Sequence, residues 1–276
     1  MPSREAAAVL VSHAAAAYHR QLQWMRLCNF LDGDAAVAVA GSRLTTFPAN
    51  PTPPIVRKPV VCRWQMSLRI SVFLWLMRRH RRPYDISYRG KAIRVFPGVF
   101  SPRYDWSSKF AVDCLPALAG KSFLEVGAGC GIVSVFAGEG GARLVVAVDI
   151  SPDSARNIAF NFDARRLSNA HVIQGDLLTA ISHKFDFIFF NAPYYGERPK
   201  DWLERAVTDE NYDTLKRFLA DVKRCLAVDG VVMLGFYKAR ERLLRAELQG
   251  AGLQVVSVRE ERRWGYRCKY FMLSAA

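Results

Sequence analysis

The sequence lacks the patterns of a metal site, a secretion signal and a membrane span. Its six cysteines are scattered, with no C-x-x-C pair and no His/Cys cluster at metal-ligand spacing, so we expect no metal and reduced thiols. The alanine-rich residues 1–17 carry Arg4, Glu5 and His13, whereas a signal peptide needs a basic start and a cleaner apolar core. The stretch 60–77 contains Arg63 and Arg69 and is shorter than the roughly 20 apolar residues of a spanning helix. We therefore expect a cytoplasmic protein without stable membrane insertion.

Acidic residues are also few, since 25 Asp and Glu stand against 39 Lys and Arg, for a net charge of +14. Most of the excess lies between Arg57 and Arg103, where twelve Lys or Arg accompany one acid, Asp85. Such a basic block favours an anionic partner, such as RNA, an acidic or ribosome-associated protein, or a membrane surface. An arginine-rich solvated face would explain it equally well, so both interpretations stay open.

From Lys121 onward, strand and helix patterns alternate, as they do in an α/β fold. This alternation predicts a mostly parallel, seven-stranded sheet with helices on both faces, and a last pair of strands that fits an antiparallel arrangement. Strands are predicted at 121–126, 144–149, 170–175, 185–191, 230–236, 253–260 and 267–274, and helices at 106–118, 131–139, 152–166, 209–226 and 238–249.

The chain is predicted to have two parts. Residues 1–83 are expected to form an N-terminal helical extension with a proline-rich linker, and residues 84–276 the main domain. The stretch 64–81 alternates like a strand, but its length and arginine-rich end favour a helix. A hairpin is predicted over 84–100, ahead of an α/β core over 106–276.

One chemical motif is the strand Phe123–Val126, which runs into a glycine-rich turn. Gly127, Gly129 and Gly131 alternate after Glu125, and glycine lets the backbone turn tightly and approach a ligand. Asp149 ends the next strand, roughly 20 residues beyond the glycines, where a carboxylate can bind ribose hydroxyls. The motif therefore predicts a site for an adenosine ligand. Because residue 132 is Ile, the dinucleotide pattern G-x-G-x-x-G is missed, which disfavours a nicotinamide-dependent oxidoreductase.

The second motif is Asn191-Ala192-Pro193-Tyr194, which follows the apolar strand Phe185–Phe190. The strand reads as buried on both faces, so Asn191 falls at the sheet edge where α/β proteins bind ligands. The Asn191 side-chain carbonyl and the Ala192 backbone carbonyl can accept two hydrogen bonds from one amino group. Pro193 fixes the turn, and Tyr194 offers a flat face. The motif predicts a holder for a planar nitrogen.

Together these motifs resemble class I S-adenosylmethionine-dependent methyltransferases. Glu125 and the alternating glycines resemble their first motif, and Asn191–Tyr194 resembles the (Asn/Asp)-Pro-Pro-(Tyr/Phe) tetrad of amino-directed members. Ala192 replaces the first proline, which keeps the carbonyl but loses some rigidity. Val95–Arg103 and Asn157–Asn161 are similar to segments of the small-domain group, which includes glutamine-N5 methyltransferases and ribosomal RNA guanine-N2 methyltransferases.

The resemblance implies a Rossmann-like class I methyltransferase fold with S-adenosyl-L-methionine as cofactor. It also implies a set of site residues. Those expected to act on the acceptor are Asn191, Ala192, Pro193 and Tyr194, with Tyr195 as a further substrate contact. Those expected to bind the cofactor are Phe100, Pro102, Arg103, Glu125, Gly127, Ala128, Gly129, Asp149, Ile150, Asp176, Leu177 and Asn191.

We therefore expect an N-methyltransferase (EC 2.1.1.-) that acts on a planar amino or amide nitrogen of a macromolecule, an RNA base or a protein glutamine. A small-molecule acceptor, such as a metabolite or natural product, is the alternative. A non-catalytic RNA- or membrane-binding module on a methyltransferase scaffold is a third interpretation. The intact Gly127, Gly129, Asp149 and Asn191 argue against that third one.

Overall fold

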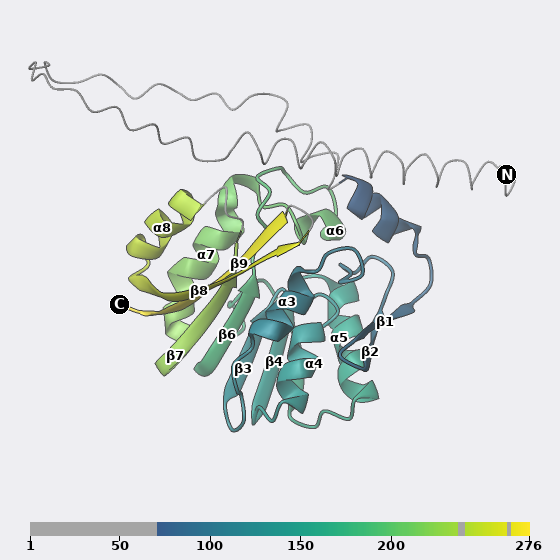
Figure 1. Ribbon diagram of the computed structural model, residues 1–276, viewed down its shortest axis with the longest axis horizontal. Coiled ribbons are helices and arrows are strands. Elements are labelled where there is room, and N and C mark those ends of the chain that lie inside the picture. The colour runs from purple at the N-terminus through teal and green to yellow at the C-terminus, as the bar shows by residue number, and fades with distance from the viewer. Residues whose placement is uncertain (1–70, 237–240, 264–265) are drawn as a thin grey trace, which may run out of the picture. The chain divides into compact units, whose positions relative to one another are not determined.

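The computed structural model describes residues 71–236, 241–263 and 266–276 (Figure 1). The chain divides into two compact units, and nearly all described residues belong to the one formed by Gln65–Glu261 and Arg267–Ala276. Most of the predicted N-terminal extension lies outside the described residues, and the predicted boundary at residue 83 stays a prediction. Residues 71–79 form a helix, in line with the helical interpretation of that stretch.

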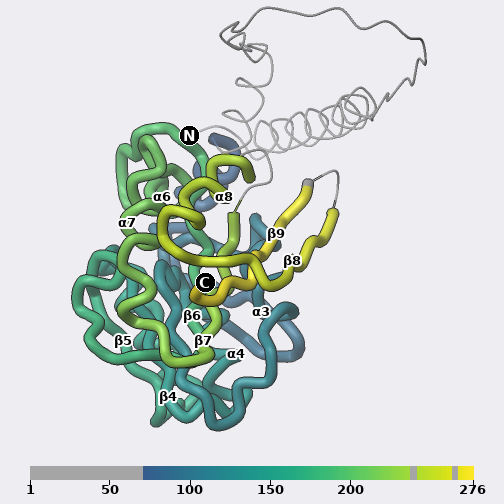
Figure 2. The backbone as a smooth tube through the Cα atoms, turned by 90° about the vertical axis from the view of Figure 1, so that its left-hand side faces the viewer, coloured from purple at the N-terminus to yellow at the C-terminus, as the bar shows by residue number. Residues whose placement is uncertain are grey.

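The main feature is a seven-stranded sheet with the strand order β5-β4-β3-β6-β7-β9-β8. Neighbouring strands from β5 to β7 are parallel, whereas β9 runs antiparallel to β7, and β8 and β9 lie side by side at the edge (Figures 1 and 2). This confirms the predicted mixed sheet. The strands are β3 (Ser122–Val126), β4 (Leu144–Asp149), β5 (Ala170–Gln174), β6 (Phe185–Asn191), β7 (Leu226–Gly235), β8 (Leu253–Arg263) and β9 (Tyr266–Ala275).

Before the sheet comes a two-stranded hairpin, β1 (Tyr84–Tyr88) and β2 (Lys91–Val95). Arg89 and Gly90 at its tip both have positive φ, as a two-residue hairpin turn requires. The helices are α3 (Ser107–Cys114), α4 (Ile132–Glu139), α5 (Pro152–Ala164), α6 (Trp202–Arg205), α7 (Asp213–Asp221) and α8 (Glu241–Gly250), with 3-10 turns η1 (Glu210–Tyr212) and η2 (Val222–Cys225). None of the helices in the described residues has the length and apolar character that crossing a bilayer requires.

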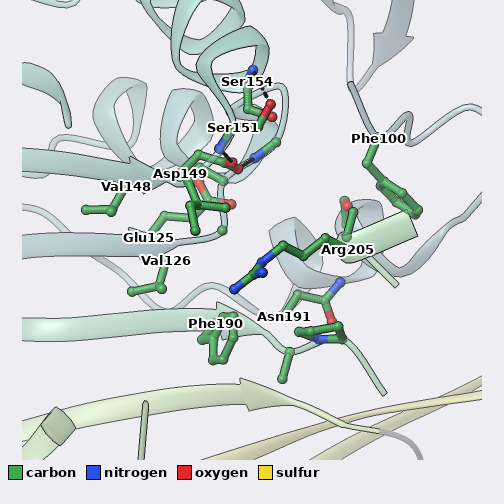
Figure 3. Close-up of a pocket in the computed structure, with 18 of the residues that line it drawn as sticks. Phe100, Glu125, Val126, Val148, Asp149, Ser151, Ser154, Phe190, Asn191 and Arg205 are labelled. Carbon is green, nitrogen blue, oxygen red and sulfur yellow. Dashed lines mark hydrogen bonds between the residues drawn. The ribbon is translucent and has the colours of Figure 1, made fainter. Parts of the chain in front are cut away.

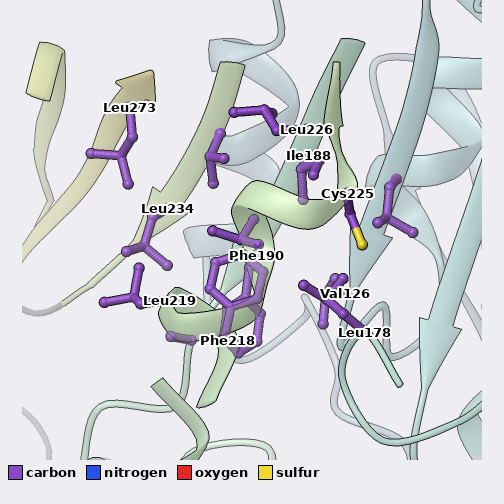
Figure 4. Close-up of a cluster of buried hydrophobic side chains, with 14 of the residues drawn as sticks. Val126, Leu178, Ile188, Phe190, Phe218, Leu219, Cys225, Leu226, Leu234 and Leu273 are labelled. Carbon is purple, nitrogen blue, oxygen red and sulfur yellow. The ribbon is translucent and has the colours of Figure 1, made fainter. Parts of the chain in front are cut away.

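The two faces of the sheet are covered by different helices. Alternate residues of the inner strands point to opposite faces, and on one face they pack with Leu215, Phe218 and Leu219 of α7 and with α8 (Figure 4). Helices α3, α4 and α5 cover the other face (Figure 1). Because both faces are apolar, the inner strands are buried throughout, and the polar groups gather at the strand ends.

One predicted helix, 209–226, is wrong in extent. Asn211 and Tyr212 have positive φ, which interrupts the helix, and the Asp209 carboxylate accepts hydrogen bonds from the backbone N–H groups of Thr214 and Leu215 at the start of α7. Strand β7 then begins at Leu226, four residues earlier than predicted. Helix α6 was not predicted at all.

Candidate active site

A cleft opens at the carboxyl ends of β3, β4 and β6 (Figure 3). It encloses about 1150 Å³ of space, part of it open to solvent. This is the edge at which open parallel sheets bind ligands. Its walls come from the glycine turn after β3, the ends of β4 and β5, the tetrad after β6, the segment ahead of α3, and α6.

The glycine turn is held against the neighbouring strand. The backbone N–H of Gly127 donates to the Val148 carbonyl oxygen at 2.8 Å. Gly127 and Gly129 have φ of +66° and +58°, a region that residues with a Cβ rarely adopt. A Cβ at Gly127 would also lie 3.5 Å from the Phe190 ring. The glycines therefore keep this part of the cleft open and line it with backbone.

Asp149 joins the glycine turn to the next helix. Its two carboxylate oxygens accept hydrogen bonds from the backbone N–H groups of Gly129 (2.8 Å) and Ser151 (2.9 Å). Burial raises the pKa of Asp149, and these hydrogen bonds oppose the rise because they favour the charged form. The Ser154 hydroxyl and the Ile150 N–H also hydrogen-bond to this carboxylate, which lines the cleft.

Glu125 lies at the end of β3 and is fully buried. Its carboxyl oxygen accepts a hydrogen bond from the Ser134 backbone N–H at 2.7 Å and another from the Ser134 hydroxyl, and so satisfies an N–H of the first turn of α4. Burial raises the pKa of Glu125 to about 8. The group is therefore mostly protonated at neutral pH, although it lines the cleft.

Asp176 and Leu177 line the cleft after β5. One Asp176 oxygen accepts a hydrogen bond from the Arg217 guanidinium of α7 at 2.6 Å. Leu177 has a φ of +52°, so the backbone turns sharply there. The second Asp176 oxygen and the adjoining backbone are the polar groups at this end of the cleft.

Two asparagines of α5 dock the hairpin onto the glycine turn. Asn157 accepts a hydrogen bond from the Phe96 N–H, and Asn161 accepts one from the Arg94 N–H. The Asn161 amide also donates to the carbonyls of Arg94 and Cys130. The segment that follows β2 is thereby fixed beside the turn, and its Phe100 and Pro102 form one wall of the cleft.

The tetrad stands at the tip of β6. The Asn191 side-chain N–H donates to the Ser107 hydroxyl at 3.2 Å, so its carbonyl oxygen is the acceptor left for another group. Ser107 is itself held, because the buried Tyr270 hydroxyl donates to the Ser107 carbonyl at 2.9 Å. Ala192, Pro193 and Tyr194 continue the cleft wall.

Gly235 on β7 makes room for this arrangement. It pairs with Asn191 across the strands, and its carbonyl accepts the Ala192 N–H at 3.2 Å. A Cβ at Gly235 would lie 2.3 Å from the Asn191 side-chain oxygen and 2.6 Å from the Tyr270 ring. The missing side chain is what allows Asn191 and Tyr270 to occupy their positions.

Comparison with known protein families identifies the family of this chain. The family model described as "Methyltransferase small domain" matches residues 91–249, more than half of the chain. The chain belongs to the methyltransferase small domain family. It is a Rossmann-like, S-adenosylmethionine-dependent methyltransferase (EC 2.1.1.-), which confirms the predicted fold class, enzyme class and cofactor.

Relatives in this family differ in what they are named for. A Methanocaldococcus jannaschii protein named as an N5-glutamine methyltransferase is 29% identical over 157 residues, covering 54% of this chain and 77% of its own length. A Shewanella loihica tRNA1(Val) (adenine(37)-N6)-methyltransferase is 29% identical over 129 residues, covering 43% and 53%. The solved ribosomal protein L11 methylase of Lactobacillus delbrueckii subsp. bulgaricus shares the fold, with a TM-score of 0.52, 19% identity, and coverage of 70% and 90%.

The residues present fit the cofactor of this methyltransferase family. The glycine turn lines the cleft with backbone, and the Asp149 carboxylate lines it beside that turn, where it would hold ribose hydroxyls. Asp176 and Leu177 line the same cleft after β5 and would be the residues that hold the adenine. When bound, S-adenosylmethionine supplies a methyl group activated by a positively charged sulfur.

Two residues expected at the methyltransferase site do not line the cleft. The Arg103 guanidinium lies over the Tyr84 ring, 5.6 Å from its centroid, where a cation–π contact holds it. Tyr195 packs with the apolar cluster of Leu74, Met77 and Leu203. The other residues predicted for the site all line this one cleft.

Among the cleft or supporting residues missed from the sequence are Ser107, Arg205 and Gly235. Ser107 and Gly235 carry no motif, because their parts depend on contacts across the sheet. A signal for α6 was present, since Asp201 and Glu204 stand at capping-box spacing, and the Asp201 side chain accepts a hydrogen bond from the Glu204 N–H at 2.8 Å. That helix brings Trp202 and Arg205 to the cleft.

Proposed function

We propose that this methyltransferase acts on a planar amino or amide nitrogen, belonging to an RNA base or to a protein side chain such as glutamine. The observation that carries the proposal is the place of Asn191 in the cleft wall, at the tip of β6. Its N–H group donates to the Ser107 hydroxyl, which leaves the carbonyl oxygen, beside Gly235, as the acceptor of this side chain. A planar amine or amide has two N–H groups, and the Ala192 carbonyl is the second acceptor of the tetrad.

The residues of this chain act mainly by positioning. Two acceptors on one amino group fix the plane of the acceptor nitrogen, and Tyr194 covers that plane. When bound, the cofactor would supply the methyl group for the new N–C bond, and the C–S bonding pair would stay on sulfur, which would become neutral. The nitrogen then loses its proton to water. The buried walls of Ala192 and Phe190 exclude water from the methyl group.

Support for a macromolecular acceptor comes from the charge of the chain and from the relatives. The net charge of +14 suits an anionic partner. The relatives named above are named for protein glutamine and for tRNA adenine, both planar nitrogens.

Asn191→Ala tests the proposal. We expect methyl transfer from tritiated S-adenosylmethionine into RNA or protein of cells lacking this protein to fall at least about 100-fold. Cofactor affinity, measured by calorimetry, should stay within about threefold. Asn169→Ala is the matched control, because Asn169 donates only to a backbone carbonyl at the opposite edge of the sheet. Normal transfer by the Asn191 variant would refute the assigned role.

A further inference from the structure

Residues 195–209, between the tetrad and α7, form a closed loop that contains α6, and we call this loop the excursion. It runs from Tyr195 to Asp209, and its two ends are joined by backbone hydrogen bonds. The Tyr195 N–H donates to the Val207 carbonyl at 3.1 Å, and the Asp209 N–H donates to the Tyr195 carbonyl at 2.7 Å. The excursion therefore starts from a fixed base, one residue after Tyr194, on the acceptor side of the cleft.

Helix α6 within the excursion presents two different faces. Leu203 packs against Leu74 and Met77 of the helix over residues 71–79, all three buried. Trp202 and Arg205, three residues apart and so on one side of the helix, line the cleft instead. The helix is thus anchored on its apolar side and offers an aromatic ring and a cation to the site.

The acids of α6 are occupied by another residue. The Arg78 guanidinium donates to the Asp201 carboxylate at 2.6 Å and to the Glu204 carboxylate at 3.0 Å. Within the part of the chain that the structure describes, no acid forms an ion pair with Arg205. The charge of Arg205 therefore remains available to a ligand.

Arg205 extends into the cleft. Figure 3 shows its side chain extending from α6 into the cleft that Val126, Phe190 and Asn191 also line. Among the described residues that line the cleft it is the one Lys or Arg. A guanidinium in a cleft is suited to bind a phosphate or carboxylate in the fork geometry that this group prefers.

The indole of Trp202, on the same side of α6 as Arg205, favours an anion that also carries a flat ring. Trp202 is 47% exposed and lines the same cleft, so a flat ring can stack on it. The methionine part of the cofactor has a carboxylate but no ring, whereas a nucleotide has both a base and a phosphate. Unstacked bases on aromatic side chains, with phosphates on arginine, are the usual features of single-stranded RNA recognition.

We propose that Arg205 and Trp202 form a nucleotide subsite for the methyl acceptor, in which the guanidinium binds a backbone phosphate and the indole stacks on a base. This inference rests on the proposed function and narrows its acceptor to RNA. The excursion is the element that selects this acceptor, and a glutamine side chain would use neither group.

The test compares Arg205→Gln with Arg198→Gln in the full chain. Arg198 lies in the same excursion and is 83% exposed, with a distant ion-pair partner at 3.8 Å, and it does not line the cleft. Binding of a fluorescein-labelled, randomised single-stranded RNA oligonucleotide is measured by anisotropy at several salt concentrations, with S-adenosylhomocysteine saturating. Affinity for S-adenosylhomocysteine alone is measured by calorimetry.

We expect Arg205→Gln to weaken RNA binding about tenfold and to reduce the salt slope by about one. Arg205→Lys should keep the salt slope, and Trp202→Leu should weaken binding without changing the slope. Affinity of Arg205→Gln for S-adenosylhomocysteine should stay within about threefold. Arg198→Gln should match the wild type in all of these measurements.

Two results would overturn the inference. A tenfold loss of S-adenosylhomocysteine affinity in Arg205→Gln would assign the guanidinium to the cofactor carboxylate. Equal RNA binding by wild type and Arg205→Gln would show that Arg205 does not bind a phosphate. If a protein were then methylated in an Asn191-dependent way, the proposed function would still hold. Failure of the proposed function itself is read separately, from the Asn191→Ala variant.

Discussion

Replacing Gly235 with alanine should lower the rate of methyl transfer, although Gly235 itself does not line the cleft. The added Cβ would lie 2.3 Å from the Asn191 side-chain oxygen and 2.6 Å from the Tyr270 ring. Carbon atoms reach their optimal contact at roughly 3.5 Å, so Asn191 or β7 must retreat by about 1 Å. The Ser107 hydrogen bond, already 3.2 Å long, cannot absorb that shift and keep its geometry.

The expected loss can be worked from this displacement. A shift of about 1 Å in a positioning group costs on the order of 100-fold in rate, which corresponds to about 2.7 kcal/mol in activation free energy. Overpacking should also lower the free energy of unfolding by about 1–3 kcal/mol. Cofactor affinity should change by less than about threefold, because the glycine turn and Asp149 lie on other strands.

The assay is methyl transfer at saturating cofactor, corrected for the folded fraction by a thermal melt, with calorimetry for the cofactor. Gly250→Ala is the matched control, since a Cβ at Gly250 meets nothing within 4 Å, and it should leave both rate and affinity unchanged. A Gly235→Ala variant that transfers methyl groups within about twofold of the wild-type rate would refute the positioning argument.

Three further outcomes are expected. Gly127→Ala should weaken S-adenosylhomocysteine binding at least about tenfold, because the left-handed backbone of Gly127 costs any other residue about 1 kcal/mol and the Cβ enters the cleft. A rise in melting temperature on adding S-adenosylhomocysteine equal to that of the wild type would contradict this. The folded pKa of Glu125, about 8, exceeds its unfolded value, so the stability that its protonated form contributes is lost as pH rises. Between pH 6 and pH 8 the free energy of unfolding should therefore fall by roughly 2 kcal/mol more in the wild type than in Glu125→Gln. Parallel pH profiles of the two proteins in denaturant titrations would count against the raised pKa. Arg78→Gln removes two partly exposed ion pairs, so the free energy of unfolding should change by less than about 1 kcal/mol. The KM for an RNA acceptor should nevertheless rise, because α6 loses its ion pairs to the helix over residues 71–79. An unchanged KM would show that these ion pairs do not affect acceptor binding.

Much of the fold could be predicted from local patterns. The alternation of apolar strands and amphipathic helices predicted all seven strands of the sheet, because strands buried on both faces leave continuous apolar runs in the sequence. The break at Asn211 and Tyr212 was not visible, since neither residue demands a left-handed backbone. Only the capping of α7 by Asp209 explains where that helix begins.

The sequence alone determined the parts of the site that are local in the chain. Turn glycines, a strand-end carboxylate and a polar tetrad each depend on neighbouring residues, so spacing was enough to bring them to one edge of a parallel sheet. Arg103 was expected at the cleft and does not line it, for the complementary reason. Its position follows from a ring contact with Tyr84 in a separate hairpin, which spacing cannot reveal.

Only the tertiary structure decided how the site is held. Ser107 lies 84 residues from Asn191 and 163 from Tyr270 along the chain, yet it hydrogen-bonds to both, through its hydroxyl to Asn191 and through its backbone carbonyl to Tyr270. The reach of Arg205 into the cleft likewise depends on the anchoring of α6 from outside. Packing between distant elements fixes these contacts, and packing leaves no repeating pattern in the sequence.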